Sequence, residues 1–126
     1  MARKQINLTK SELLLMEVIW RNGHATVAEV AGGLPKSVDL AYNTVLTTLR
    51  ILERKGYLRH TTAGESRAFI YHPLVSREQA SRSAVGNLLS RFFGNSAEAL
   101  VLNLIEDKKL TDAEWKRVRA LLKEKP

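Results

Sequence analysis

One stretch decides the fold of this chain: Leu40–Gly56, which reads LAYNTVLTTLRILERKG. Its apolar residues recur at the spacing of a helix, because Val45, Leu49 and Leu52 fall at positions i, i+4 and i+7. A glycine directly after such a pattern is typical of the residue that follows the last helical turn. The stretch therefore predicts a long amphipathic helix with one face packed on a core.

The opposite face of this helix carries a polar stripe made of Asn43, Thr47, Arg50 and Arg54. In the major groove of DNA, Asn can pair with adenine, Arg with guanine, and a Thr methyl group can contact thymine. An ordinary solvated face would more often carry Glu–Lys pairs, which support a helix at i,i+4. Taken alone, the helix leaves two interpretations open, a DNA-reading face or a merely polar outer face.

The preceding residues predict two more helices. Thr9–Glu12 is a capping box that begins a helix ending at Gly23, and Thr26–Glu29 is a second capping box. The short helix that it begins ends at Gly32–Gly33. We expect Asp39 to be the N-cap of the long helix. Helix, short helix and long helix thus follow one another closely.

Beyond the long helix the period changes from 3.6 to 2. Tyr57–Thr61 and Arg67–His72 alternate apolar and polar residues, with a turn at Thr62–Ser66 between them. This predicts a β-hairpin packed against the three helices, which is the order of a winged helix-turn-helix module. The fold class that follows is mainly α with a small β-hairpin wing.

Three further side chains are candidates for contact with DNA phosphates. Arg59 and Arg67 are expected beside the hairpin turn, one on each strand, where they would reach the backbone or the adjacent minor groove. The alternative is a strand edge that charge protects from aggregation. Tyr42 is expected to have a partly buried ring and an exposed hydroxyl that can bond a phosphate, and otherwise belongs to the core. Together with the polar stripe of the long helix, these residues favour nucleic acid.

From Ser76 the helical period returns and predicts a C-terminal region of three helices. These helices carry more apolar surface than they can bury by themselves. A second copy of the chain would cover that surface in a symmetric dimer, and the competing interpretation is a monomer that folds it back on the winged module. The expected dimer contacts are Leu88, Leu89, Phe92, Leu100, Val101, Leu104, Ile105, Trp115, Val118 and Leu122.

Composition excludes several classes of protein. The chain has 126 residues, a net charge of +7 that favours polyanions, and no Cys, so disulfides and thiolate metal sites are impossible. His24, His60 and His72 are not paired at i,i+3 or i,i+4, and no phosphate loop or nucleophile elbow is present. We therefore expect no metal, no cofactor and no enzymatic activity. Without a signal peptide or a membrane span, a cytoplasmic protein with no membrane insertion is expected.

Several segments together resemble the BlaI/MecI penicillinase-repressor family of winged helix-turn-helix regulators. Ala-Tyr-x-Thr-Val-x-Thr and Phe-x-Tyr-x-Pro-Leu-Val are fairly specific in combination, and the resemblance covers nearly the whole chain. The segments that carry it are Leu13–Trp20, Ala25–Val27, Leu40–Thr47, Lys55–Leu58, Arg67–Val75 and Ala99–Ile105.

The resemblance implies a homodimeric repressor on a dyad-symmetric operator that controls β-lactamase or other antibiotic-response genes. Thr44 and Thr47 match family residues near base edges. In the best-known members a membrane-bound sensor metalloprotease triggers cleavage after an Asn that matches Asn103; Leu104 stands where those members have Phe. The alternative for Asn103 is a polar residue at a helix-packing seam. Copper sensing through a C-terminal Cys pattern, known in relatives, is excluded here.

The combined interpretation is a repressor of two domains, a winged-helix DNA-binding domain over residues 1–75 and a helical dimerisation domain over residues 76–126. Its partners are double-stranded operator DNA and a second copy of the chain. The alternative function is a winged-helix adaptor that binds protein and has no DNA sequence preference. The residues expected to read bases are Asn43, Thr44, Thr47 and Arg50, and those expected to bind phosphates are Tyr42, Arg54, Arg59 and Arg67.

Overall fold

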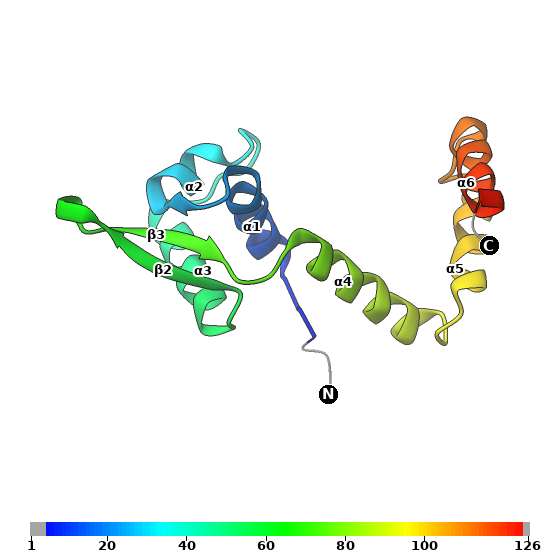
Figure 1. Cartoon of the computed structure of the whole chain (residues 1–126), viewed down its shortest axis with the longest axis horizontal. Coiled ribbons are helices and arrows are strands. Elements are labelled where there is room, and N and C mark those ends of the chain that lie inside the picture. Colours follow the sequence, from blue (N-terminus) through cyan, green and yellow to red (C-terminus); the bar gives the residue numbers. More distant parts are fainter. Residues whose placement is uncertain (1–4, 125–126) are drawn as a thin grey trace. The chain divides into compact units, whose positions relative to one another are not determined.

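The computed structural model describes residues 5–124 and consists mainly of helices, with one small sheet (Figure 1). Residues 1–4 and 125–126, which the expected domains include, lie outside the described part. The chain divides into two compact units between Ala84 and Val85. The elements in order are α1 (Lys10–Asn22), β1 (Ala25–Thr26), α2 (Val27–Gly33), α3 (Tyr42–Arg54), β2 (Leu58–Ala63), β3 (Ala68–Pro73), α4 (Arg77–Phe92), α5 (Ala97–Glu106) and α6 (Asp112–Glu124).

The sheet has three antiparallel strands in the order β1-β3-β2. The expected hairpin is present, and Tyr71 lies between Ala25 on β1 and His60 on β2. Figure 1 shows that β2 and β3 extend together away from α1 and α2, which makes them the wing of the fold. The sequence did not predict β1, because a two-residue strand is too short for an alternating pattern. The predicted class, a winged-helix module followed by C-terminal helices, is confirmed.

One expected strand position is wrong. Arg67 does not lie on a strand but in the turn between β2 and β3, directly after a short 3₁₀ segment at Gly64–Ser66. Its φ of 55° puts it in the left-handed region, and its N–H donates to the Ala63 carbonyl at 3.2 Å. The turn has two residues with positive φ, Gly64 at 39° and Arg67. The arginine therefore stands at the wing tip.

The core of the first unit forms around the apolar face of α3. Val45, Leu49 and Leu52 are fully buried, as the helical spacing predicted. They pack with side chains of α1, α2 and the sheet in one cluster. On α1, Leu15 is fully buried while Leu13 is 41% exposed. The largest fully buried side chains are Tyr71, Leu15, Met16, Ile19, Leu49, Leu52 and Leu58.

Both predicted capping boxes are confirmed. The hydroxyls of Thr9 and Thr26 each accept from the backbone N–H three residues on, and the glutamate at that position accepts from the backbone of the threonine. The predicted cap of α3 is wrong, because the helix begins at Tyr42 with Ala41 as its N-cap. Leu40 packs against the core from the segment before the helix, and this contact holds the chain extended past Asp39.

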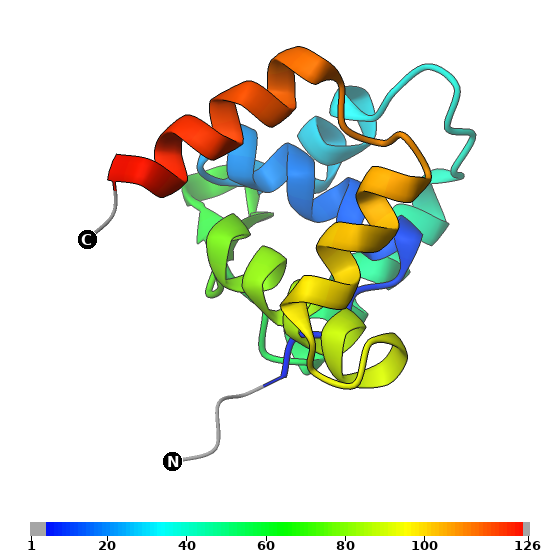
Figure 2. The same ribbon diagram turned by 90° about the vertical axis from the view of Figure 1, so that its right-hand side faces the viewer.

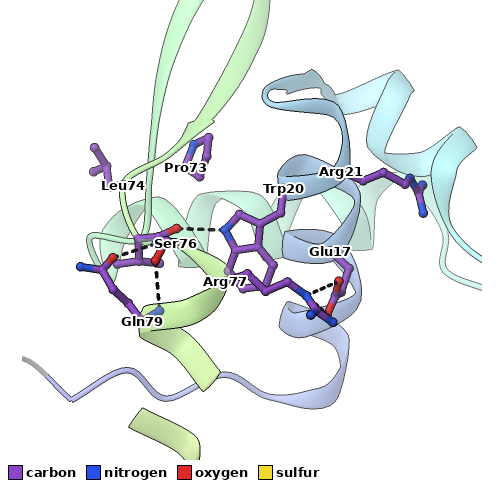
Figure 3. A pocket seen from close by; sticks show the side chains of 9 residues that line it. Glu17, Trp20, Arg21, Pro73, Leu74, Ser76, Arg77 and Gln79 are labelled. Atoms are coloured by element: carbon purple, nitrogen blue, oxygen red, sulfur yellow. Dashed lines mark hydrogen bonds and ion pairs between the residues drawn. The ribbon is translucent and has the colours of Figure 1, made fainter. Parts of the chain in front are cut away.

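The first turn of α4 is attached to α1 within the first unit. The indole N–H of Trp20 donates to the Val75 carbonyl at 2.9 Å, and Arg77 binds the Glu17 carboxylate at 3.0–3.2 Å. Ser76 and Gln79 cap the helix reciprocally. These side chains line an open hollow of about 800 Å³. Figure 3 shows how they lie around it. The bond from Arg77 to Glu17 raises the pKa of the guanidinium above its ordinary value.

The second unit contains α5, α6 and the end of α4. A bend at residues 107–111 separates α5 from α6, so that the two helices run in different directions (Figure 2). Ser96 caps α5, and Thr111 with Glu114 forms a capping box for α6. Across Ala97–Glu106 and Asp112–Glu124, all within the described residues, no side chain is buried. The apolar side chains of these helices therefore remain accessible in a single chain.

Candidate nucleic-acid interface

The outer face of α3 gathers the residues that the sequence singled out for base contacts. Asn43, Thr44, Thr47 and Arg50 are all exposed and lie on the side of the helix away from the buried stripe. Thr48, the other threonine of this helix turn, faces inward instead. It is nearly buried, and its hydroxyl donates to the Thr44 carbonyl at 2.7 Å. The exposed stripe therefore consists of polar side chains whose donors and acceptors bond to no other side chain within residues 5–124, and the apolar face lies on the other side of the helix.

The N-terminus of α3 differs from those of α1 and α2 because no side chain caps it. The first backbone N–H groups of a helix have no partner within the helix, and they form the positive end of its dipole. Tyr42 stands at this end of the helix and is 55% exposed. This end of α3 can accept an anion such as a phosphate oxygen.

The wing adds two cations to this surface. Arg59 is exposed on β2, on the strand face opposite to that of Leu58, and Arg67 is exposed at the tip. Beside Arg59, Thr61 and His72 hydrogen-bond at 2.9 Å across the strands. Partial burial lowers the pKa of the His72 imidazole below its ordinary value, and the charges of Arg59 and His24 lower it further. At neutral pH the positive charge of this strand face comes from Arg59.

Sequence reasoning missed a cluster on the other face of the wing. His60 Nδ1 donates to the Glu53 carboxylate at 2.6–2.9 Å, and the imidazole stacks on the Phe69 ring with centroids 4.0 Å apart. Alternation along β2 places His60 on the same face as the buried Leu58, which points towards α3. That alternation was the available signal, and combined with the position of Glu53 in the last turn of α3 it could have indicated the contact.

Other kinds of site find little support within residues 5–124. Over that range, no group of three or more His, Asp or Glu side chains could hold a metal ion. None of the helices in the same range is long and apolar enough to cross a membrane. The hollow beside Trp20 is lined by α1, the end of β3 and the start of α4, and no residue of α3 lines it.

Comparison with known proteins shows which family the chain resembles. Residues 8–124 match the family model described as Penicillinase repressor. The chain is 29% identical over 122 residues to the penicillinase repressor of Bacillus licheniformis, covering 97% of this chain and 94% of that protein. It is 22% identical over 125 residues to the methicillin resistance regulatory protein MecI of Staphylococcus aureus strain N315, covering 99% of this chain and all of that protein.

Solved structures of the repressor BlaI are also similar to this chain, over part of its length. The DNA-binding domain of the repressor BlaI superposes with a TM-score of 0.52 at 31% identity, over 62% of this chain and 93% of that one. The monomeric form of Bacillus licheniformis BlaI in complex with the blaP half-operator gives 0.51 at 32% identity, over 60% and 90%.

The fold and the exposed stripe of α3, with these likenesses, define a winged-helix DNA-binding transcriptional repressor and not an enzyme. The chain belongs to the penicillinase repressor (BlaI/MecI) family, which confirms the resemblance seen in its sequence motifs.

Proposed function

We propose that this repressor binds an operator as a homodimer, with α3 of each protomer in the major groove. The observation that carries this proposal is the exposed stripe of amide, hydroxyl and guanidinium groups on α3, backed by the fully buried Val45, Leu49 and Leu52. A BlaI relative that was solved with a half-operator supports the choice of ligand. Domain roles follow, with residues 1–75 reading DNA and residues 76–126 joining the protomers.

The bases are read by side chains near the start and middle of α3. Asn43 can pair bidentately with adenine and Arg50 with guanine, while methyl groups of Thr44 and Thr47 can contact thymine. All four side chains are exposed and need no rearrangement of the core to enter a groove. Because each good bidentate contact discriminates by about 1–3 kcal/mol, Asn43 and Arg50 carry most of the sequence preference.

The phosphates are held from three directions. The uncapped N-terminus of α3 and the Tyr42 hydroxyl bind on one side of the groove, and Arg54 binds at the other end of the helix. Arg59 and Arg67 bind through the wing. These contacts fix the register of α3 on the duplex and supply salt-dependent affinity without sequence choice.

The second unit supplies the dimer contact. Large apolar side chains are exposed repeatedly along this unit, including Phe92 at 71% and Leu122 at 63%. Exposed apolar surface marks an interaction site where it is contiguous. A two-fold arrangement would cover the same patch on both protomers. The proposed contacts are Leu88, Leu89, Phe92, Leu100, Val101, Leu104, Ile105, Trp115, Val118 and Leu122.

The regulated genes are, on this proposal, β-lactamase or other antibiotic-response genes, and the relatives named for penicillinase and methicillin resistance support it. A repressor acts where its operator lies, so we expect the protein in the cytoplasm. A membrane-bound sensor metalloprotease would relieve repression by cutting between Asn103 and Leu104. The Asn103 carbonyl accepts from the Asp107 N–H at 3.0 Å, so the end of α5 must unwind before a protease can bind that bond in extended form.

Selection of duplexes from a random pool, followed by sedimentation of the complex, tests the proposal. We expect an enriched motif of two inverted half-sites, bound by two protein chains. An adaptor that binds proteins would enrich no motif and would bind duplexes weakly and equally at every sequence. A motif bound by one chain would retain DNA reading and contradict the dimer.

A further inference from the structure

We infer that Glu53 is a positioning residue for DNA binding: through His60 and Phe69 it holds the wing at a fixed angle to α3. This inference rests on the proposed function, because it concerns how the wing and the helix reach DNA together. It adds a residue that need not touch DNA itself.

The first link joins the helix to the wing. Glu53 lies in the last turn of α3, and both of its carboxylate oxygens lie within hydrogen-bond distance of His60 Nδ1, at 2.9 and 2.6 Å. The two side chains are 31% and 34% exposed, so water screens the contact only in part. Two short distances to one N–H fix the imidazole on the helix end.

The second link passes the constraint to the other strand of the wing. The His60 imidazole lies nearly parallel to the Phe69 ring, at 13° with centroids 4.0 Å apart. Both rings also lie near Tyr71, at 6.0 Å from His60 and 6.3 Å from Phe69, and Tyr71 is fully buried. The cluster therefore connects α3, β2, β3 and the core at one point.

The position of this cluster along the wing explains its importance. From His60 to Phe69 every residue is exposed except Ala63, which is partly buried. The strand pairing keeps β2 and β3 together, but pairing alone does not set their angle to α3. Since Figure 1 shows the hairpin extending away from the helices, a small rotation at its base moves the tip, and with it Arg67, by a larger distance.

If Glu53 acted only through its negative charge, its removal would strengthen DNA binding rather than weaken it. The inference can therefore be tested. Glu53 stands between Arg50 and Arg54 on the helix that faces DNA. A carboxylate there repels phosphates, so its removal would strengthen binding if charge were its only role. Positioning predicts weaker binding when Glu53 is removed.

The test measures operator affinity of Glu53→Ala, with Glu65→Ala as the matched control. Glu65 is an exposed carboxylate in the wing turn, so its removal changes the net charge equally without touching the cluster. We expect a loss of affinity of about fivefold or more for Glu53→Ala and none for Glu65→Ala. Equal or tighter binding of folded Glu53→Ala would overturn the inference.

A double-mutant cycle with Arg67→Ala separates this inference from the proposed function. If Glu53 acts by placing the wing tip, Glu53→Ala should have less than a twofold effect once Arg67 is gone. The same loss in both backgrounds would contradict positioning. If Arg67→Ala leaves wild-type affinity unchanged, the wing contact of the proposed function fails instead, whatever the result for Glu53.

Two further measurements keep the test decisive if Glu53→Ala is poorly folded. His60→Phe keeps a ring to stack on Phe69 but loses the bond to Glu53, and it should show the same loss of affinity. Because the chain has no Cys, spin labels will attach only to the two cysteines that are introduced in place of Asn22 and Glu65. Their distance distribution should be narrow in the wild type and broader in His60→Phe, and an unchanged distribution would overturn the inference.

Discussion

Glu12 in the first turn of α1 binds Lys55, directly after α3, with both carboxylate oxygens at 2.8–2.9 Å from the ammonium. The ammonium also lies 3.4 Å from the Asn7 carbonyl, and the Asn7 N–H donates to the Tyr57 hydroxyl at 2.9 Å. These bonds fix the end of α3 against the N-terminal segment and α1. The helix proposed to read DNA is thus held at its C-terminal end by an ion pair as well as along its length by the core.

The first prediction concerns this ion pair at neutral pH. Glu12 is almost fully buried, so Glu12→Gln leaves the Lys55 ammonium without its counter-charge and weakens the bonds to the Thr9 N–H. We expect the free energy of unfolding to fall by about 2 kcal/mol, less than for a wholly buried pair because Lys55 is partly solvated. Urea unfolding at pH 7 measures it, and an unchanged midpoint would contradict it.

The same carboxylate gives a prediction on pH. Burial alone would raise the pKa of Glu12, but hydrogen bonds from Lys55 and Thr9 and the charge of Lys55 outweigh it and hold the pKa below its ordinary value of 4.5. A lowered folded pKa contributes stability above 4.5 that is lost as the pH falls through the folded pKa. The stability difference between wild type and Glu12→Gln should therefore shrink as the pH falls below 4.5, as measured by urea unfolding across the acid range.

A substitution at Tyr71, unlike Glu12→Gln, should not lower the stability of the protein. Its hydroxyl is buried with no hydrogen-bond partner among residues 5–124. Burial raises the pKa of this phenol, as does the nearby charge of Glu53, while Arg50 opposes the rise. Tyr71→Phe removes an unsatisfied polar group and keeps the ring, so stability should stay equal or rise by up to about 1 kcal/mol. Thermal unfolding measures this stability, and a clearly less stable variant would contradict the account.

The two faces of α3 should separate stability from DNA binding. Leu49→Ala empties a fully buried site and should lower the free energy of unfolding by about 2–5 kcal/mol. Thr47→Ala, on the exposed face, should change stability by no more than about 0.5 kcal/mol and yet weaken operator binding. Paired urea unfolding and binding titrations measure both quantities. A Thr47→Ala variant with full affinity would remove Thr47 from the interface.

The salt dependence of DNA binding tests whether Arg67 on the wing contacts a phosphate. Arg67→Ala should weaken binding uniformly across sequences and reduce the slope of log affinity against log salt by about 1, because one phosphate contact is lost. Titrations of a fixed duplex at several salt concentrations give the slope. Asp substitution at the same exposed position should weaken binding further, and a slope that stays at its wild-type value in both variants would exclude the contact.

Sequence reasoning succeeded where local spacing decides structure. The buried stripe of α3, the capping boxes and the hairpin all depend on residues within a few positions of one another. It failed at Arg67, where the wing turn extends one residue past Ser66. It also failed where contacts across the fold decide, because Leu40 packs on the core and α3 begins past Asp39. The Glu53–His60 bond was missed for the same reason, because predicting it requires the angle between a helix and a strand, which sequence spacing does not give.

The candidate site was likewise predictable from the sequence only in part. Periodicity along α3 was enough to predict which of its side chains are exposed, because helix geometry and one buried stripe fix the outer face. Their individual roles on bases or phosphates stay predictions, as do the dimer contacts and the bond between Asn103 and Leu104. Those roles depend on DNA, a second chain and a protease, and no spacing within one chain specifies them.

The most direct test of the account repeats the duplex selection with Arg50→Ala. If two copies of α3 read the operator through this arginine, the variant should select the same inverted half-sites but lose its preference at one base pair in each, at symmetric positions. The cost for the wild-type operator should be about 1–3 kcal/mol. An unchanged motif, or a uniform loss of affinity on all sequences, would contradict base reading by the outer face of α3.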